Sequence, residues 1–245
     1  MRSTLNLLLV CSLVATFAGC SDNNDEAPEG AVNATVYGEA FIEEGIPAEE
    51  MADGWAVTFE SFVVDVEDIA VGGVTLPSAD NVEISEGTNG QGQVISTAAV
   101  PEGSYEGSSF DITRVALRGA ATKDGVTKTF DWAFDQTVRY TACETTTEVT
   151  GDADPSTFQI TVHADHYFYD SLVAEEPNVV FQALADADAD GDDVITRAEL
   201  ESAGIGGYDA GNAEVDNLWT WLEAQNATLG HVDGEGHCDS QIIPN

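Results

Sequence analysis

The chain has 245 residues, of which 43% are hydrophobic, and its 45 acidic against 7 basic side chains give a formal net charge of −38. This charge argues against nucleic-acid binding and against anionic membrane surfaces, because both partners need a basic protein surface. It is typical either of divalent-cation binding or of a solvated surface in salty surroundings, and for most of these carboxylates we expect the second.

The first residues are typical of a secretory signal peptide, predicted over residues 1–19. A basic residue precedes an apolar stretch that is too short for a mature membrane-spanning helix. The run Phe17-Ala18-Gly19-Cys20 resembles the bacterial lipobox, which implies cleavage before Cys20, a thioether-linked lipid on that residue and N-acylation with a fatty acid such as palmitate. Ser21 at the next position implies sorting to the outer membrane, on either of its faces. We therefore expect a lipoprotein of the cell envelope, held to the membrane by this lipid and continued by an acidic tether over 20–32.

Residues 33–173 have the short alternating runs of β-strands, separated by Gly, Pro and Asp and without a helical period. We expect an antiparallel β-sandwich here, as the first part of an α+β chain. One alternating run changes phase at Glu60-Ser61, which predicts a β-bulge. The Asp124-Gly125 turn predicts a hairpin between a strand around residues 113–117 and the alternating run at 130–134.

One segment of this region resembles known lipoproteins. Val100-Pro101-Glu102-Gly103-Ser104-Tyr105, followed by Phe110-Asp111-Ile112, is similar to the edge of transthyretin-like lipoprotein domains. It also resembles the copper-binding β-sandwich lipoproteins associated with methanobactin uptake. The match is confined to this segment, so it carries no function across to the chain.

The cysteines predict one disulfide. Cys11 lies in the signal peptide and Cys20 is expected to carry the lipid, which leaves Cys143 and Cys238. In an oxidising compartment, two remaining cysteines indicate a bond between them.

Residues 174–245 change to a helical period. We expect a first helix capped by Asn178, a second that begins near Thr196, and a third behind a cap at Asn212. The apolar stripe of the third helix would consist of Val215, Leu218, Trp219 and Leu222. A loop rich in Gly and His closes the chain.

Between the first two helices, residues 188–199 resemble the EF-hand calcium loop. Calcium is a hard cation that takes about six to eight oxygen ligands, and the loop of this family offers them at fixed positions. The resemblance implies these ligands: the side chains of Asp188, Asp190 and Asp192, the backbone carbonyl of Val194, Thr196 directly or through water, and both carboxylate oxygens of Glu199.

A second register of this loop begins at Asp186 and places Gly191 at the sharp turn. It puts the cation Arg197 where the bidentate acid must be, so we favour the register that begins at Asp188. Asp193 then occupies the turn and needs a left-handed backbone, which aspartate tolerates better than most residues. Because EF-hands generally occur in pairs and only one loop is present, we expect weak binding, with a dissociation constant on the order of 10⁻⁴ to 10⁻³ M, and a structural role.

All four histidines of the chain lie in two short segments, His163-Ala164-Asp165-His166 and the run from His231 to His237. The predicted disulfide would bring the segments together, provided that the first strand ends and turns at His163, since a regular strand would point His163 and His166 to opposite faces. Neutral imidazoles are typical ligands of zinc and copper, and Asp165, Asp233 or Glu235 could assist them. The alternative is a polar contact in which the imidazoles bind carboxylates and backbone groups.

The chain has no Walker loop, GxSxG elbow or HExxH helix, so we expect no enzymatic activity. The first hypothesis is a non-catalytic exported lipoprotein that Ca²⁺ stabilises. The alternative is a lipoprotein that binds or delivers zinc or copper through the histidine segments, and a hydrolase ranks last because no nucleophile is marked. The sequence indicates no protein partner.

Overall fold

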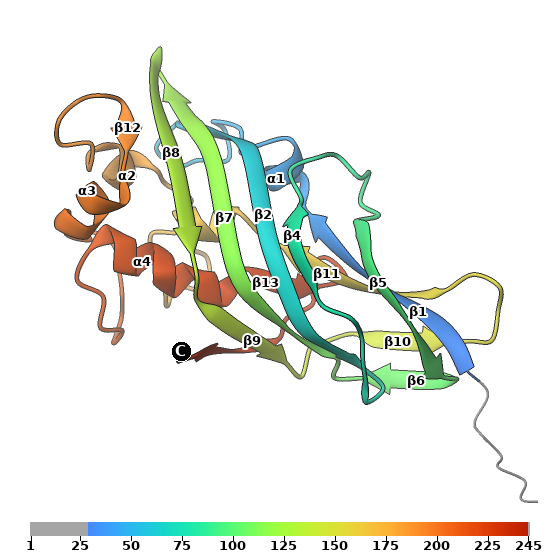
Figure 1. Ribbon diagram of the computed structural model, residues 1–245. Helices are drawn as coiled ribbons and strands as arrows, with labels where there is room; N and C mark the ends of the chain where they lie inside the picture. Colours follow the sequence, from blue (N-terminus) through green and yellow to red (C-terminus); the bar gives the residue numbers. More distant parts are fainter. Residues whose placement is uncertain (1–28, 245) are drawn as a thin grey trace, which may run out of the picture.

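Strands are the main secondary structure in the part of the chain that the computed structural model describes, residues 29–244 (Figure 1). The predicted signal peptide, Cys20 and most of the tether lie outside these residues. The strands are β1 (Glu29–Gly38), β2 (Ala56–Val71), β3 (Val74–Thr75), β4 (Ala79–Glu83), β5 (Gln93–Pro101), β6 (Gly103–Glu106), β7 (Ser109–Lys123), β8 (Val126–Phe134), β9 (Thr137–Thr141), β10 (Thr146–Val149), β11 (Ser156–Val162), β12 (Val194–Ile195), β13 (Gly230–Val232) and β14 (Asp239–Ile243). The helices are α1 (Ala40–Glu43), α2 (Gln182–Ala185), α3 (Arg197–Ser202) and α4 (Leu218–Gln225), with 3₁₀ turns η1 (Asp165–Phe168) and η2 (Asn226–Thr228). Within the described range, none of these helices is long and apolar enough to cross a membrane.

The largest sheet is built around β2 and β7, which pair antiparallel along most of their length. β8 and then β12 extend it on one side, β3 and β4 pair with β2, and β9 pairs with β7 and carries β14. The β2 to β7 register shifts between Phe59 and Ser61, which confirms the predicted β-bulge. β7 and β8 are joined through Asp124 and Gly125, both at positive φ, which confirms the predicted hairpin.

A second sheet has the strand order β13, β11, β1, β5, and β6 pairs separately with β10. The chain is thus rich in β-structure and has several sheets, as the sequence predicts. β1 and β11 pair in parallel, from Val32 with Ser156 to Gly38 with Val162, so the antiparallel prediction is wrong for this pair, whereas β5 and β13 pair antiparallel with β1 and β11. The physical reason is that the larger sheet is formed by the chain between these two strands, and such a long crossover permits parallel pairing.

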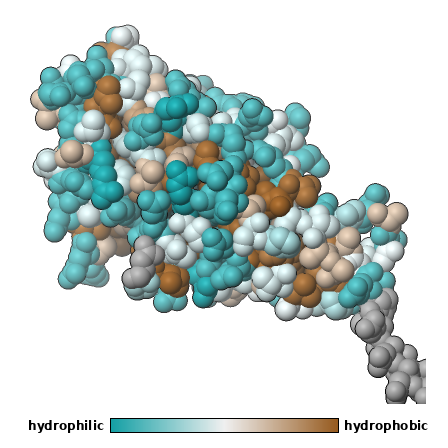
Figure 2. Space-filling model, viewed as in Figure 1, coloured by the Kyte–Doolittle hydropathy of each residue, from teal (hydrophilic) through white to brown (hydrophobic). Residues whose placement is uncertain are grey.

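The two sheets share one apolar core. Phe62 of β2 and Val36 of β1 are completely buried, and Phe110 of β7 contacts Phe158 of β11 with ring centroids 6.4 Å apart. Burial of such side chains stabilises the fold by about 25 cal/mol for each Å² of apolar surface removed from water. Hydrophilic residues cover much of the face seen in Figure 2, in keeping with the acidic composition.

Both predicted helix caps, Asn178 and Asn212, are wrong. Asn178 donates to the Asp170 carboxylate instead, and the Asp53 carboxylate accepts the backbone N–H groups of Phe181 and Gln182 at 2.6 and 2.7 Å where α2 begins. This cap comes from a residue more than a hundred positions earlier in the chain, so no local pattern could reveal it.

The later helices follow the sequence more closely. α3 begins next to Thr196, as predicted, and Thr196 caps it in a capping box with Glu199. α4 begins behind Asn217 rather than Asn212, because the Asn217 side chain accepts the N–H of Thr220 at 2.9 Å. Val215 therefore precedes the helix, while the other members of the predicted stripe are buried on it.

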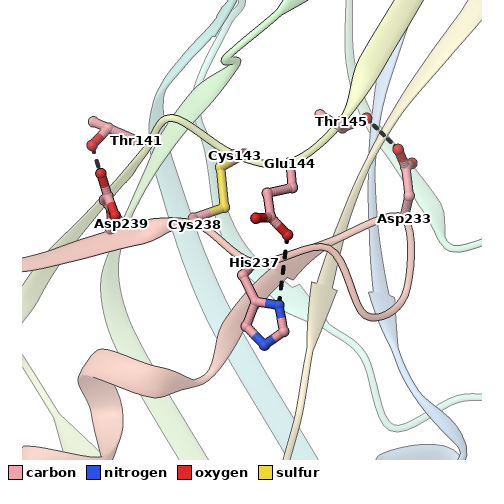
Figure 3. The surroundings of a disulfide bond; sticks show 8 residues. All are labelled: Thr141, Cys143, Glu144, Thr145, Asp233, His237, Cys238 and Asp239. Atoms are coloured by element: carbon pink, nitrogen blue, oxygen red, sulfur yellow. Dashed lines mark hydrogen bonds and ion pairs between the residues drawn. A yellow bond between two sulfur atoms is a disulfide. The ribbon is translucent and has the colours of Figure 1, made fainter.

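The predicted disulfide between Cys143 and Cys238 is present (Figure 3). It joins the loop that follows β9 to the residue just before β14, and β14 pairs antiparallel with β9 beside it. The C-terminal part of the chain also contributes β12 to the larger sheet and β13 to the smaller one. Residues 174–244 are thus tied into both sheets.

Candidate functional site

The acidic loop, defined as residues 188–199, follows α2, includes the first turn of α3 and lies beside β8 (Figure 1). Its strand β12 pairs in parallel with β8, and the Thr129 N–H donates to the Asp193 carbonyl at 2.9 Å. Ile195 is buried, and its carbonyl accepts the indole N–H of Trp132 at 2.9 Å. Ile195 thus packs in the core beside the larger sheet.

Three of the predicted calcium ligands are brought together. Asp188, Asp190 and Glu199 each place one carboxylate oxygen so that all three oxygens lie within 4.8 Å of one another. The Asp192 carboxylate is not part of this group and accepts the Val194 N–H at 2.9 Å. Thr196 donates its hydroxyl to the Glu199 carboxylate at 2.7 Å.

Glu199 has both carboxylate oxygens held in place. One accepts the Ala189 N–H at 2.9 Å, and the other accepts the N–H and hydroxyl of Thr196 at 2.9 and 2.7 Å. The bonds from Thr196 lower the pKa of the Glu199 carboxyl, so this group is ionised at neutral pH. Glu199 thus connects the beginning of α3 to the first turn of the acidic loop.

The backbone of the loop bears on its register. Asp193 has φ of +69°, the left-handed conformation predicted for the turn position, and Gly191 is also left-handed at +74°. Arg197, the cation that disfavours the alternative register, binds Glu201 at 2.7 Å and lies over the Trp219 ring at 4.5 Å. Its side chain is therefore engaged outside the carboxylate group.

Lys128 of β8 is the residue of this site that the sequence does not reveal. Its ammonium lies 2.5 Å from an Asp188 carboxylate oxygen and 2.8 Å from one of Asp193. These contacts raise the pKa of Lys128, and the hydrogen bond from Lys128 lowers the pKa of Asp188. Only the pairing of β12 with β8 brings a residue 60 positions earlier in the chain to this loop.

The histidine cluster is defined as His163, His166, His231 and His237. It lies in the second sheet, where β11 ends and β13 pairs with it. β11 ends at Val162 and η1 begins at Asp165, so the chain turns as the predicted convergence requires. The centroid of the His231 ring lies 4.2, 5.3 and 5.2 Å from those of His163, His166 and His237 respectively. All four imidazoles therefore share one neighbourhood, as predicted.

Carboxyl groups surround these imidazoles. One carboxylate oxygen of Asp165 lies within 4.8 Å of a ring nitrogen of His163 and of one of His166, and His163 has the same proximity to oxygens of Glu39 and Glu235. An Asp165 oxygen accepts the Tyr169 hydroxyl at 2.7 Å. Glu39, just after β1, was missed because the sequence marks it only as one acidic residue among many.

Burial determines the charges in the cluster. Burial, followed by repulsion from Asp165 and Glu235, raises the pKa of Glu39 to about 8. Burial and repulsion from neighbouring imidazoles lower the pKa values of His166 and His231 to about 4. These two imidazoles are therefore neutral at pH 7.

No protein family matches this chain, and comparisons with curated proteins and with solved structures find no match.

Proposed function

We propose that this protein is a non-catalytic calcium-binding protein in which one EF-hand loop, residues 188–199, binds Ca²⁺ in a structural role. The observation that carries the proposal is the convergence of oxygens from Asp188, Asp190 and Glu199 in a loop with EF-hand spacing. The left-handed Asp193 supports the same register.

The donor set suits calcium. It consists of carboxylate oxygens with no nitrogen or sulfur ligand, and Ca²⁺ prefers such hard donors. Hydrogen bonds donated by Ala189 and Thr196 hold the two Glu199 carboxylate oxygens beside the loop. Asp192, the Val194 carbonyl and Thr196 would complete the shell, and Lys128 would have to release Asp188.

The attachment of the loop supports a structural role. In a paired EF-hand the apolar position contacts a second loop, which can transmit a calcium signal. Ile195 instead enters the core beside Trp132, so the bound ion would join α2 and α3 to the edge of the larger sheet. A β-sandwich with this helical segment attached is the architecture that we propose.

The proposed setting is the cell envelope, with the protein held by a lipid on Cys20. Support within the described residues comes from the Cys143 to Cys238 disulfide, which suits an oxidising compartment. Calcium affinities in the weak range, on the order of 10⁻⁴ to 10⁻³ M, match extracellular modules.

Isothermal titration of the chelator-treated protein with Ca²⁺ tests this proposal. We expect one ion per chain and loss of binding in Glu199→Gln. Glutamine still completes a capping box with Thr196, so the variant should keep α3 while it loses the charge and the bidentate ligand.

Asp186→Asn is the matched control, because its carboxylate binds Gln182 on α2 and lies outside the favoured register. Wild-type heats that stay at the level of dilution would refute calcium binding. Loss of binding in Asp186→Asn, with binding retained in Glu199→Gln, would refute the register.

A further inference from the structure

We propose that the histidine cluster, together with Glu39 and Asp165, is a second metal site that takes one divalent cation of the zinc class. It is separate from the acidic loop and does not depend on calcium binding there.

The hydrogen bonds of two imidazoles fix where their lone pairs lie. His163 Nε2 is 3.1 Å from the Gly234 carbonyl, which can only accept, so Nε2 carries the hydrogen and Nδ1 has the lone pair. That Nδ1 lies 3.5 Å from a Glu39 oxygen. A backbone carbonyl that holds the far nitrogen of a ring is a common way to orient a metal-binding histidine.

His166 is oriented in the same manner by Thr228. The Thr228 hydroxyl donates to the Gln225 carbonyl at 2.8 Å, so its oxygen must accept from His166 Nδ1 at 3.0 Å. His166 therefore has its lone pair on Nε2. Each ring therefore has one unprotonated nitrogen that is not bound to Gly234 or Thr228.

Three buried polar atoms of the site lack a hydrogen-bond partner. They are Nδ1 of His231 and one carboxyl oxygen each of Glu39 and Asp165. The exposed fraction of His231 is 6% and that of Asp165 is 9%, so neither side chain compensates by contact with water. Buried polar groups without partners destabilise a fold by about 1–3 kcal/mol each in general, and a bound cation would satisfy them together.

The donor chemistry selects the class of ion. Imidazole nitrogens with one or two carboxylates suit Zn²⁺ and similar borderline cations, whereas Ca²⁺ prefers oxygen alone. Two ligands of one tetrahedral ion at about 2.0–2.2 Å lie about 3.3–3.6 Å apart. The ligand atoms of His163, Asp165 and His166 lie within 4.8 Å of one another, so the widest of these spacings would contract by up to about 1 Å around a bound ion.

An ion can reach the cluster from solvent. His166, His231 and His237 line a surface hollow of about 200 Å³. The His237 side chain is exposed and stands beside the disulfide, with Nδ1 3.8 Å from Glu144 (Figure 3). Since Cys238 follows His237 directly, the disulfide holds this ring at the entrance.

Calorimetric titration of the purified protein with Zn²⁺, in the presence of saturating Ca²⁺ to fill the acidic loop, tests the site. We expect one Zn²⁺ per chain, with affinity reduced at least about tenfold by His166→Gln and by Asp165→Asn. The matched control is Asp239→Asn, an exposed aspartate two residues beyond His237, which should leave zinc affinity unchanged. Equal affinity in all three variants, or no zinc binding by the wild type, would overturn the site.

A second measurement on the wild type avoids any variant that does not fold. In imidazole ¹⁵N NMR spectra, Zn²⁺ should shift His163 Nδ1 and His166 Nε2, while their partner nitrogens keep the protonated form. Zinc binding that leaves both resonances in place would assign the ion to another part of the protein and refute the proposal. If Zn²⁺ binds here but Ca²⁺ does not bind the acidic loop, only the calcium proposal fails.

Discussion

The Lys128 ammonium binds the Asp188 carboxylate, which calcium would need as a ligand. In Lys128→Met the chain keeps a long side chain but loses the ammonium that binds Asp188 and Asp193. We expect calcium to bind at least about two- to fivefold more tightly, because neither competition nor repulsion from the ammonium remains; that range is the scale of an exposed ion pair, and the Lys128 to Asp188 pair is largely buried. Calorimetric titration measures this change, and Lys128→Arg, which keeps the charge, should resemble the wild type. Weaker binding in Lys128→Met would mean that the ammonium organises the loop for calcium.

At the scale of single residues, the sequence predicts contacts that depend on local spacing. Asp188, Asp190 and Glu199 converge because the loop itself fixes their positions. Lys128 and Glu39 reach their sites only through strand pairing, and the sequence does not specify which acidic or basic residues will meet in that way. The same limit explains why Asp53 rather than Asn178 caps α2.

The elements of the larger sheet were predictable where a turn or a phase change marks them. The Asp124-Gly125 turn predicts the hairpin, and the change of phase in the alternating pattern at Glu60-Ser61 predicts the bulge. The parallel pairing of β1 with β11 has no such local signal, because these strands are separated by most of the chain. The inferred disulfide predicted convergence of the histidine segments only on the condition that the strand turns at His163, and the sequence left that turn open.

Glu83, at the end of β4, holds the β2 bulge in place. Its carboxylate accepts the Ser61 hydroxyl at 2.6 Å, the Phe62 N–H at 2.8 Å and the Ser85 hydroxyl at 2.7 Å. Burial raises the pKa of Glu83, but these hydrogen bonds outweigh it, so the pKa is lowered in the folded state. Glu83 therefore contributes stability above its unfolded pKa, and this contribution is lost as pH falls through the lower folded value.

Glu83→Gln should remove this part of the acid dependence. We expect the variant to be less stable than the wild type at pH 7 and the difference to shrink as pH falls below about 4, where an unfolded glutamate becomes protonated. Urea unfolding across this pH range measures the difference, and Glu86→Gln, a nearby glutamate in the segment between β4 and β5, is the control. A difference that stays constant with pH would show that the carboxylate charge does not stabilise the bulge.

At the scale of the whole molecule, the acidic loop is attached to the β-structure by a strand pairing and a buried hydrogen bond. β12 pairs with β8, and the Trp132 indole binds the Ile195 carbonyl inside the core. An ion that binds only the folded loop should therefore stabilise the entire fold, by RT ln(1 + [L]/Kd), which is about 1.4 kcal/mol when free calcium is ten times the dissociation constant. For a chain of this size, each kcal/mol raises the melting temperature by about 2–4 °C.

Thermal unfolding followed by tryptophan fluorescence at increasing calcium concentrations tests the central claim most directly. We expect one cooperative transition whose melting temperature rises by a few degrees with calcium, falls on chelation, and does not respond in Glu199→Gln. A melting temperature that stays constant up to several millimolar calcium in the wild type would contradict the account.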